Sequence, residues 1–440
     1  MSNTDLAGLI LLAMLVLIAL RVPIGAAMFV TGAVGYWAMV GQTALLSHLK
    51  GLLWARLSVY DLSVIPLFLL MGQFATAAGF SRTLFHAAST MVGHRLGGVA
   101  MAAIVACAVF GAICGSSVAT AATMSQVALP EMRRLRYSDR LATGTLAVGG
   151  TLGILVPPSV ILIIYALLAE QSIVKLFAAA FVPAFIAIGL YIATIAVYVR
   201  LVPGHATAQP RATRGERRAA IAAAWPIAAI FVTMFGGIYG GYFTATEGAA
   251  VGTVATLLLG VARGELGWRA IAHSFVPTAQ ATGMILTVLI GATMMNAALA
   301  VSQVPVNLAT WLTALEMPPL VVVGVFLAGF IALACVLDEL AMLLLLLPIL
   351  LPTIVGLELF GLTVEHKAIW FGILMLTATG IGLVAPPIGL NVYVVASVAR
   401  TVRIGEIYRG TLPFLVSDLL RLALLVLAPA ITLWALRFVR

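Results

Sequence analysis

The stretch Gly153-Ile154-Leu155-Val156-Pro157-Pro158 decides the fold of this chain, because it interrupts a long apolar segment in which a helix is expected. A second stretch of the same kind, Gly382-Leu383-Val384-Ala385-Pro386-Pro387, follows 229 residues later inside another apolar segment. Proline lacks a backbone N–H, clashes with the preceding turn, and disfavours helical geometry in the residue before it. Each segment therefore predicts two half-helices separated by a break. Two interrupted spans at corresponding positions of two halves are typical of the binding site of a secondary transporter.

The composition indicates that these segments lie in a membrane. Of 440 residues, 63% are hydrophobic and only 9% are charged, whereas soluble domains carry about 25% charged residues. The sequence predicts an all-α polytopic membrane protein. The first five residues lack a basic region, so we interpret 6–20 as a retained span and not as a signal peptide.

Apolar segments and turn residues predict two similar halves. The expected spans and hairpins are 6–20, 24–42, 59–80, a re-entrant hairpin at 98–130, a broken helix at 142–168, 172–200, 219–240, 244–262, 277–302, a hairpin at 319–352, a broken helix at 367–398, and 413–436. Each half then crosses the membrane five times, so the second half enters from the opposite face. We therefore predict two inverted repeats, 1–202 and 219–440, joined by a hydrophilic linker at 203–218.

The distribution of Lys and Arg supports this topology. With the linker in the cytoplasm, seventeen basic residues lie on the cytoplasmic side and six on the opposite side, while Arg421 lies within a span. This bias obeys the positive-inside rule and places both termini outside. The formal net charge of +9 is thus explained by topology, and it does not indicate nucleic-acid binding.

Two short segments beside the spans have an interfacial pattern. Segments 44–57 and 264–276 each combine a tryptophan, Trp54 or Trp268, with adjacent basic residues. Such segments lie along the membrane surface. We expect them to be matching arms that brace a fixed scaffold.

Hydroxyl groups at the first hairpin suggest a cation site. Ser116, Ser117 and Thr120 follow Gly115, where the hairpin is expected to turn. Hydroxyl oxygens and freed carbonyls are hard ligands that suit Na⁺. The alternative is that small residues here only permit close helix packing, and we prefer that interpretation for Ala119.

The two breaks supply helix ends of opposite polarity. A half-helix C-terminus presents carbonyls to a cation, and a half-helix N-terminus presents amides to an anion. The residues expected to line the breaks are Gly153, Val156, Pro157 and Ser159 in the first half, and Gly382, Ala385, Gly389 and Asn391 in the second. For Asn391, an interhelical hydrogen bond is the alternative role.

Few acidic residues lie in the spans, and each has two interpretations. Asp338, at the turn of the second hairpin, is expected either to neutralise a cation or to cap the next half-helix. Glu247 is more simply a partner of a helix N-terminus. Cys107, Cys114 and Cys335 lack metal-binding spacing and are expected to pack in apolar surroundings, so no transition-metal site is predicted.

No enzyme motif or nucleotide-binding loop is found, so the chain is not expected to be an enzyme and needs no cofactor. Transport must then draw its energy from an ion gradient. A passive channel is the alternative of a different class, but inverted repeats with breaks at mid-membrane favour alternating access.

Several motifs together resemble one known family. They are Phe110-Gly-Ala-Ile-Cys-Gly-Ser-Ser-Val-Ala-Thr120, Ile65-Pro-Leu-Phe-Leu-Leu-Met-Gly72, Phe243-Thr-Ala-Thr-Glu-Gly-Ala-Ala250, Pro348-Ile-Leu-Leu-Pro352 and the two Pro-Pro stretches. In this order they resemble the large membrane subunit of tripartite ATP-independent periplasmic (TRAP) transporters. The resemblance implies a Na⁺-driven importer of the bacterial inner membrane that works as an elevator and carries a small carboxylate-type anion.

The resemblance also implies partners and site residues. The partners are a soluble periplasmic substrate-binding protein and a small four-helix membrane subunit, which we expect as a separate chain because this one begins directly with its first span. The predicted Na⁺ ligands are Ser116, Ser117, Thr120, Gly153, Val156, Asp338, Gly382 and Ala385. The predicted substrate contacts are Ser117, Pro157, Pro158, Ser159, Pro387, Gly389 and Asn391.

The chain departs from the family pattern at three positions. Asp338 is followed by Glu339-Leu340-Ala341, where the family usually has Thr-Pro-Ala; Ala385 stands where Thr is frequent; and Cys114 replaces a usual Ser. At the second cation site and the substrate contacts two hydroxyls are therefore missing, and Asp338 or Glu339 is the candidate replacement. A stand-alone Na⁺/carboxylate symporter of the same superfamily is the second hypothesis.

Overall fold

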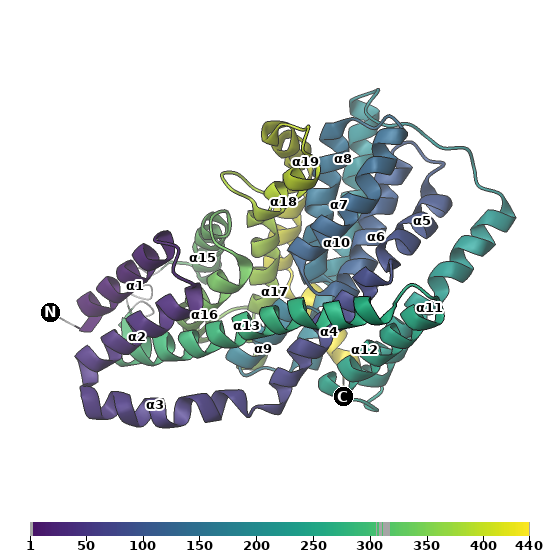
Figure 1. Cartoon of the computed structure of the whole chain (residues 1–440). Coiled ribbons are helices and arrows are strands. Elements are labelled where there is room, and N and C mark those ends of the chain that lie inside the picture. Colours follow the sequence, from purple (N-terminus) through teal and green to yellow (C-terminus); the bar gives the residue numbers. More distant parts are fainter. Residues whose placement is uncertain (1–2, 305, 308–309, 311–316, 440) are drawn as a thin grey trace.

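The computed structural model describes residues 3–304, 306–307, 310 and 317–439, and every regular element in these residues is helical (Figure 1). The α-helices are α1 (Asn3–Ala19), α2 (Ile24–Val40), α3 (Gln42–Leu57), α4 (Val64–Ala77), α5 (Phe80–Val92), α6 (Gly98–Cys114), α7 (Ser117–Arg134), α8 (Asp139–Leu155), α9 (Val160–Leu168), α10 (Ile173–Leu201), α11 (Arg214–Tyr239), α12 (Ala245–Ala262), α13 (Trp268–Ser302), α15 (Pro319–Ala334), α16 (Glu339–Gly356), α17 (Val364–Gly382), α18 (Leu390–Val398), α19 (Ile404–Leu427) and α20 (Pro429–Leu433). Short 3₁₀ turns cover Tyr60–Ser63 and Trp434–Phe438. The predicted all-α class is confirmed.

Only some of the described helices are long enough to span a membrane. Seven helices of the described residues are long and apolar enough to cross a bilayer, or eight if the bent pair α8 and α9 is one span. Helices α1 and α2 have 17 residues each, slightly less than the ~20 residues that a bilayer core requires. Residues 303–318, between the predicted span 277–302 and the predicted hairpin 319–352, fall mostly outside the described residues.

Both predicted breaks are present. Helices α8 and α9 are separated by residues 156–159 and differ in direction by 41°. Helices α17 and α18 are separated by residues 383–389. Both Pro-Pro bonds, Pro157–Pro158 and Pro386–Pro387, are cis. Each break lies where the missing proline N–H groups predict it.

Both hairpins are also present as helix–turn–helix units. In the first, α6 ends at Cys114 and α7 begins at Ser117, with Gly115 at φ +64°. In the second, α15 and α16 are joined by residues 335–338. Figure 1 shows α6, α7, α8 and α10 standing together, with α18 and α19 beside them.

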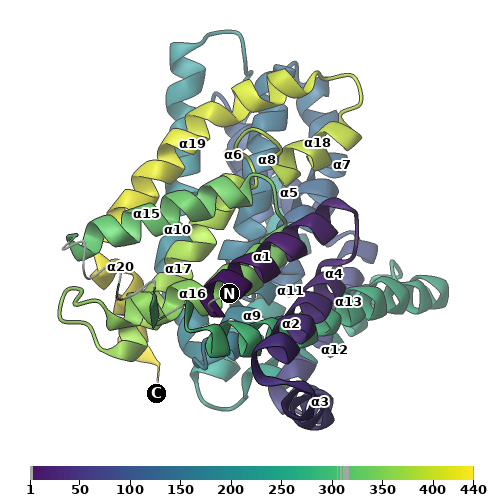
Figure 2. The ribbon, with the colours of Figure 1, turned by 90° about the vertical axis from the view of Figure 1, so that its left-hand side faces the viewer.

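A seam of glycines lets two scaffold helices pack backbone to backbone. Helix α2 lies against α13, and a Cβ added at Gly32 would lie 2.7 Å from the Met295 nitrogen. A Cβ at Gly291 of α13 would lie 2.2 Å from the Gly25 carbonyl oxygen. Small residues commonly allow such close approach between membrane helices. In Figure 2, α1 and α2 lie on the near side of the molecule.

The prediction of two matching arms is wrong for the second arm. Segment 44–57 forms most of a separate helix, α3, which turns away from α2 at Gly41 (φ +93°). Segment 264–276 has no such break, and its helical part continues into the span as the 35-residue helix α13. Helix α13 passes through Pro277, and the adjacent Thr278 hydroxyl donates to the Ser274 carbonyl at 2.8 Å.

Two other boundaries differ from the sequence prediction. Residues 81–97 were expected to connect spans, but Phe80–Val92 form helix α5. The last span, expected at 413–436, begins at Ile404 and ends at Leu427, where Ala428 and Pro429 separate it from α20. Proline at the first position of α20 explains the interruption, since it supplies no N–H to continue α19.

Candidate functional site

The tip of the first hairpin lies directly against the first helix break. A Cβ added at Gly153 would lie 2.5 Å from the Thr120 hydroxyl oxygen and 2.6 Å from the Ser116 carbonyl oxygen. A Cβ at Gly111 would lie 2.6 Å from the Gly153 Cα. The glycines therefore permit a contact that no larger residue allows. The structure brings Ser116, Thr120 and Gly153 together, as predicted.

Oxygen atoms are concentrated at this contact. Pro157 and Pro158 have no N–H, so the carbonyls of Gly153 and Ile154 lose their partners one turn ahead. The Thr120 hydroxyl donates to the Ser116 carbonyl at 2.7 Å, and Val156 follows as the first extended residue of the break. Carbonyl and hydroxyl oxygens at the end of a half-helix are suitable ligands for Na⁺.

The second half places its break against the second hairpin. A Cβ added at Gly382 would lie 2.1 Å from the Ala334 Cβ, at the end of α15. Gly389, at φ +56°, donates its N–H to the Cys335 carbonyl at 3.3 Å. In the first half, Val160 donates to the Gly115 carbonyl at 3.4 Å. In each half, therefore, the chain leaving the break is hydrogen-bonded to the hairpin turn.

A side-chain hydrogen bond joins the two halves. The Ser117 hydroxyl donates to the Asn391 side-chain oxygen at 2.9 Å, and the Asn391 amide donates to the Ala147 carbonyl at 3.2 Å. Both side chains are completely buried. Asn391 therefore forms the interhelical bond that was the alternative role, tying α18 to α7 and α8.

Two acidic residues at helix starts, Asp338 and Glu247, take part in capping. One carboxylate oxygen of Asp338 accepts from the Leu340 and Ala341 N–H groups, at 2.9 Å each. Ser159 and Ser116 cap α9 and α7 through their hydroxyls. Glu247 and Thr244 form a capping box at the start of α12, which confirms the predicted helix-terminal role of Glu247.

A cavity of about 840 Å³ opens at the two hairpin turns. Ser116 borders it from the first hairpin, and Asp338 and Glu339 border it from the second. The remaining lining comes from α1, α2, α4, α9, α13, α18 and the α1–α2 connection, which contributes Arg21. None of the seven predicted substrate contacts lines this cavity, and three of them, Ser117, Ser159 and Asn391, are fully buried.

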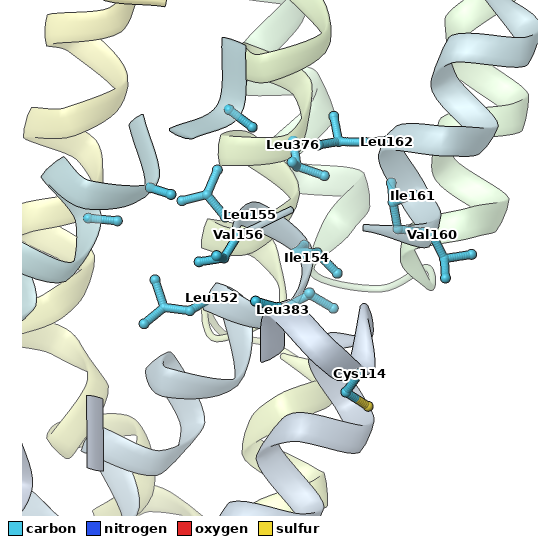
Figure 3. Packing of buried hydrophobic residues seen from close by; sticks show 14 of the residues in the cluster. Cys114, Leu152, Ile154, Leu155, Val156, Val160, Ile161, Leu162, Leu376 and Leu383 are labelled. Atoms are coloured by element: carbon cyan, nitrogen blue, oxygen red, sulfur yellow. The ribbon is translucent and has the colours of Figure 1, made fainter. Parts of the chain in front are cut away.

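The surroundings of the first break are apolar. Figure 3 shows Leu152, Ile154, Leu155 and Val156 on one side of the break and Val160 and Ile161 on the other. Each of these side chains is at most 9% exposed. Water-poor surroundings strengthen any interaction between an ion and the carbonyls at the break.

The polar groups that complete the second break escaped the sequence prediction. The Tyr408 hydroxyl lies 3.0 Å from the Pro387 carbonyl and 2.5 Å from that of Ile388, and the Thr411 hydroxyl donates to the Val384 carbonyl at 3.3 Å. Both residues belong to α19. They satisfy carbonyl groups within the break that have no helical partner, as broken helices in membranes require.

A buried charged cluster lies beside the first break. Arg421 and Asp418 form an ion pair at 2.9 Å on α19 and are 2% and 1% exposed at the side chain. The Tyr191 hydroxyl lies 2.8 Å from Asp418 and 3.2 Å from the Thr151 hydroxyl, two residues before Gly153. The cluster thus connects α19 and α10 to the end of α8.

The described residues contain no group of three His, Cys, Asp or Glu side chains arranged for a metal ion.

Comparison with known proteins identifies the family of this arrangement. Residues 11–431 match the sequence profile of "Tripartite ATP-independent periplasmic transporter, DctM component". The chain belongs to the large-permease family of TRAP transporters. The resemblance noted in the sequence is thereby confirmed, and the chain is a subunit of a multi-pass membrane transporter.

The relatives of this permease are named for different substrates. The C4-dicarboxylate TRAP large permease of Pseudomonas aeruginosa is 35% identical over 377 residues, which cover 85% of this chain and 86% of the relative. The sialic acid large permease SiaM of Vibrio cholerae is 31% identical, with the same coverage. The ectoine/5-hydroxyectoine large permease UehC of Ruegeria pomeroyi is 28% identical over 98% of both chains.

A solved structure supports the fold. The crystal structure of the YdaH transporter of Alcanivorax borkumensis matches with a TM-score of 0.65 and 17% identity, covering 88% of each chain. At this identity the likeness concerns the fold alone.

Proposed function

We propose that this permease imports a small carboxylate-type solute across the bacterial inner membrane, coupled to Na⁺ and delivered by a periplasmic binding protein. The single observation that supports this most strongly is the contact between the first hairpin and the first break. There the Ser116 carbonyl, the Thr120 hydroxyl and the backbone of Gly153 lie together. This is the oxygen-rich environment that a Na⁺ ion requires.

The second break is proposed to hold a further Na⁺ ion with different ligands, and Gly382, Ala385 and Asp338 would contribute there. The neighbouring cavity would receive the solute, although the expected solute contacts Pro157, Pro158, Pro387 and Gly389 are not among the residues that line it. Since hydroxyls frequent in the family are missing at positions 339 and 385, backbone carbonyls and the Asp338 carboxylate would replace them.

The proposed motion is that of an elevator. The hairpins and broken helices would move as one body, because hydrogen bonds such as Ser117–Asn391 join them. The glycine seam between α2 and α13 would keep the scaffold fixed. The small membrane subunit would bind the scaffold, and the binding protein would deliver solute from the periplasm.

Uptake should require Na⁺ and the binding protein together. Proteoliposomes that contain the permease and its small subunit should accumulate the solute only when both are present. At a membrane potential of 100 mV, each net positive charge entering contributes about 2.3 kcal/mol. Full uptake in choline buffer would contradict Na⁺ coupling. Full uptake without the binding protein would favour the stand-alone symporter.

The inverted topology predicts opposite labelling of two matched threonines. A cysteine at Thr213 in the linker should react with an impermeant thiol reagent only from the cytoplasm. A cysteine at Thr313, outside the described residues, should react only from the periplasm. The reason is the odd number of crossings in each half and the bias of basic residues toward the linker side. Labelling of both sites from the same face would contradict the inversion.

A further inference from the structure

The cavity at the hairpin turns is lined by two charged side chains that form no ion pair within the described residues. Its polar side chains are Arg21, Ser116, Thr287, Asp338 and Glu339. Ser116 caps α7, Thr287 donates to the Gly283 carbonyl at 2.7 Å, and Asp338 caps α16. Arg21 and Glu339 remain, and no ion pair of the described residues includes either of them.

Glu339 is placed to bind a positive charge. One of its carboxylate oxygens is fully buried without a hydrogen-bond partner. The ionised form of a carboxyl group in this position is stabilised by a cation or a donor that arrives from outside the chain. Asp338 does not fill this role, because its carboxylate is directed to the N–H groups of Leu340 and Ala341.

Arg21 provides the opposite charge at another wall of the same cavity. It lies between α1 and α2 in a left-handed conformation (φ +67°). A guanidinium is suited to bind a carboxylate through paired donors. The cavity therefore presents an acidic group on the hairpin and a basic group on the scaffold side, within about 840 Å³.

We propose that the solute released into this cavity is a zwitterion, whose cationic group pairs with Glu339 and whose carboxylate faces Arg21. This inference rests on the proposed function, since it names the chemical class of the imported carboxylate. A dianion of the same size would place its second carboxylate beside Glu339, where like charges repel. The departure from the family pattern at position 339 then acts as a determinant of specificity.

A matched pair of probes tests the proposal. 4-Aminobutyrate and succinate have the same chain length and one carboxylate in common, and differ in carrying an ammonium or a second carboxylate. Binding to the purified permease complex in nanodiscs with saturating Na⁺ is measured by the shift in melting temperature. The wild type should prefer 4-aminobutyrate by about tenfold or more, the selectivity expected of one charge pair.

Substitutions of Glu339 and Arg21 test whether this preference depends on their charges. Glu339→Gln should abolish or reverse it, Glu339→Asp should retain it in part, and Arg21→Gln should weaken both probes equally. Equal binding of the probes, binding of neither, a preference for succinate, or an unchanged preference in Glu339→Gln would overturn the proposal. An effect of Glu339→Gln on the Na⁺ requirement alone would assign Glu339 to Na⁺ instead. Na⁺-dependent uptake by the wild type, measured in parallel, shows whether the proposed function survives such a result.

Discussion

Gly153→Ala should raise the Na⁺ concentration for half-maximal uptake by about tenfold or more, which corresponds to about 1.4 kcal/mol. The added Cβ would lie 2.5 Å from the Thr120 hydroxyl oxygen and 2.6 Å from the Ser116 carbonyl oxygen. The second of these atoms is backbone, so the contact cannot be relieved by a rotamer change. The hairpin must move away from the break, and the proposed ligands then separate.

A matched substitution controls for the general effect of alanine in a helix. Gly189 lies on the exposed side of α10, and nothing lies within 4 Å of a Cβ added there. Gly189→Ala should leave the Na⁺ dependence unchanged. Both variants are first compared by melting temperature in choline buffer, so that unfolding is separated from loss of the ion. An unaltered Na⁺ dependence in folded Gly153→Ala would show that the ion binds elsewhere.

Asn391→Leu should destabilise the protein by about 2 kcal/mol and strongly reduce transport. The substitution leaves the buried Ser117 hydroxyl without its partner and removes the side-chain bond to the Ala147 carbonyl, and an unsatisfied buried polar group costs about 1–3 kcal/mol. It also removes the side-chain hydrogen bond between α18 and the first hairpin, so the two halves of the proposed moving body are joined less firmly. The free energy of unfolding in detergent and uptake in proteoliposomes measure the two effects.

The control for this variant lies on the same helix. Ser397 is exposed, and its hydroxyl donates only to the Val394 carbonyl of α18 at 2.7 Å. Ser397→Ala should therefore change neither stability nor uptake. The double variant Ser117→Ala, Asn391→Leu should be little worse than Asn391→Leu alone, because both remove the same bond. Wild-type stability and uptake in Asn391→Leu would show that this bond does not hold the halves together.

The broken helices could be predicted from sequence because their cause is local. Pro157 and Pro386 lack an N–H wherever they stand, and this requires a break whatever surrounds it. The turn at Gly115 follows from the same kind of argument. The family could be recognised because its motifs surround these breaks.

The partners of polar residues could not be predicted, because they depend on distant segments. Asn391 reaches Ser117 across 274 residues of sequence, and whether it contacts a solute or a neighbouring helix depends on that packing. Tyr408 gives no local signal of its role at Pro387. Likewise, the amphipathic pattern of 264–276 does not show that the helix continues through Pro277. The hydrogen bond from the Thr278 hydroxyl to the Ser274 carbonyl, which accompanies this continuation, is seen only in the folded chain.

The most direct test of the account is a cryo-electron microscopy structure of the permease complex in NaCl, compared with one in choline chloride. The account predicts density in NaCl alone for an ion coordinated by oxygens of Ser116, Thr120 and Gly153, beside the cavity at the hairpin turns. A well-resolved map in which this position is empty under conditions that support uptake, or is filled equally in choline chloride, would contradict the account.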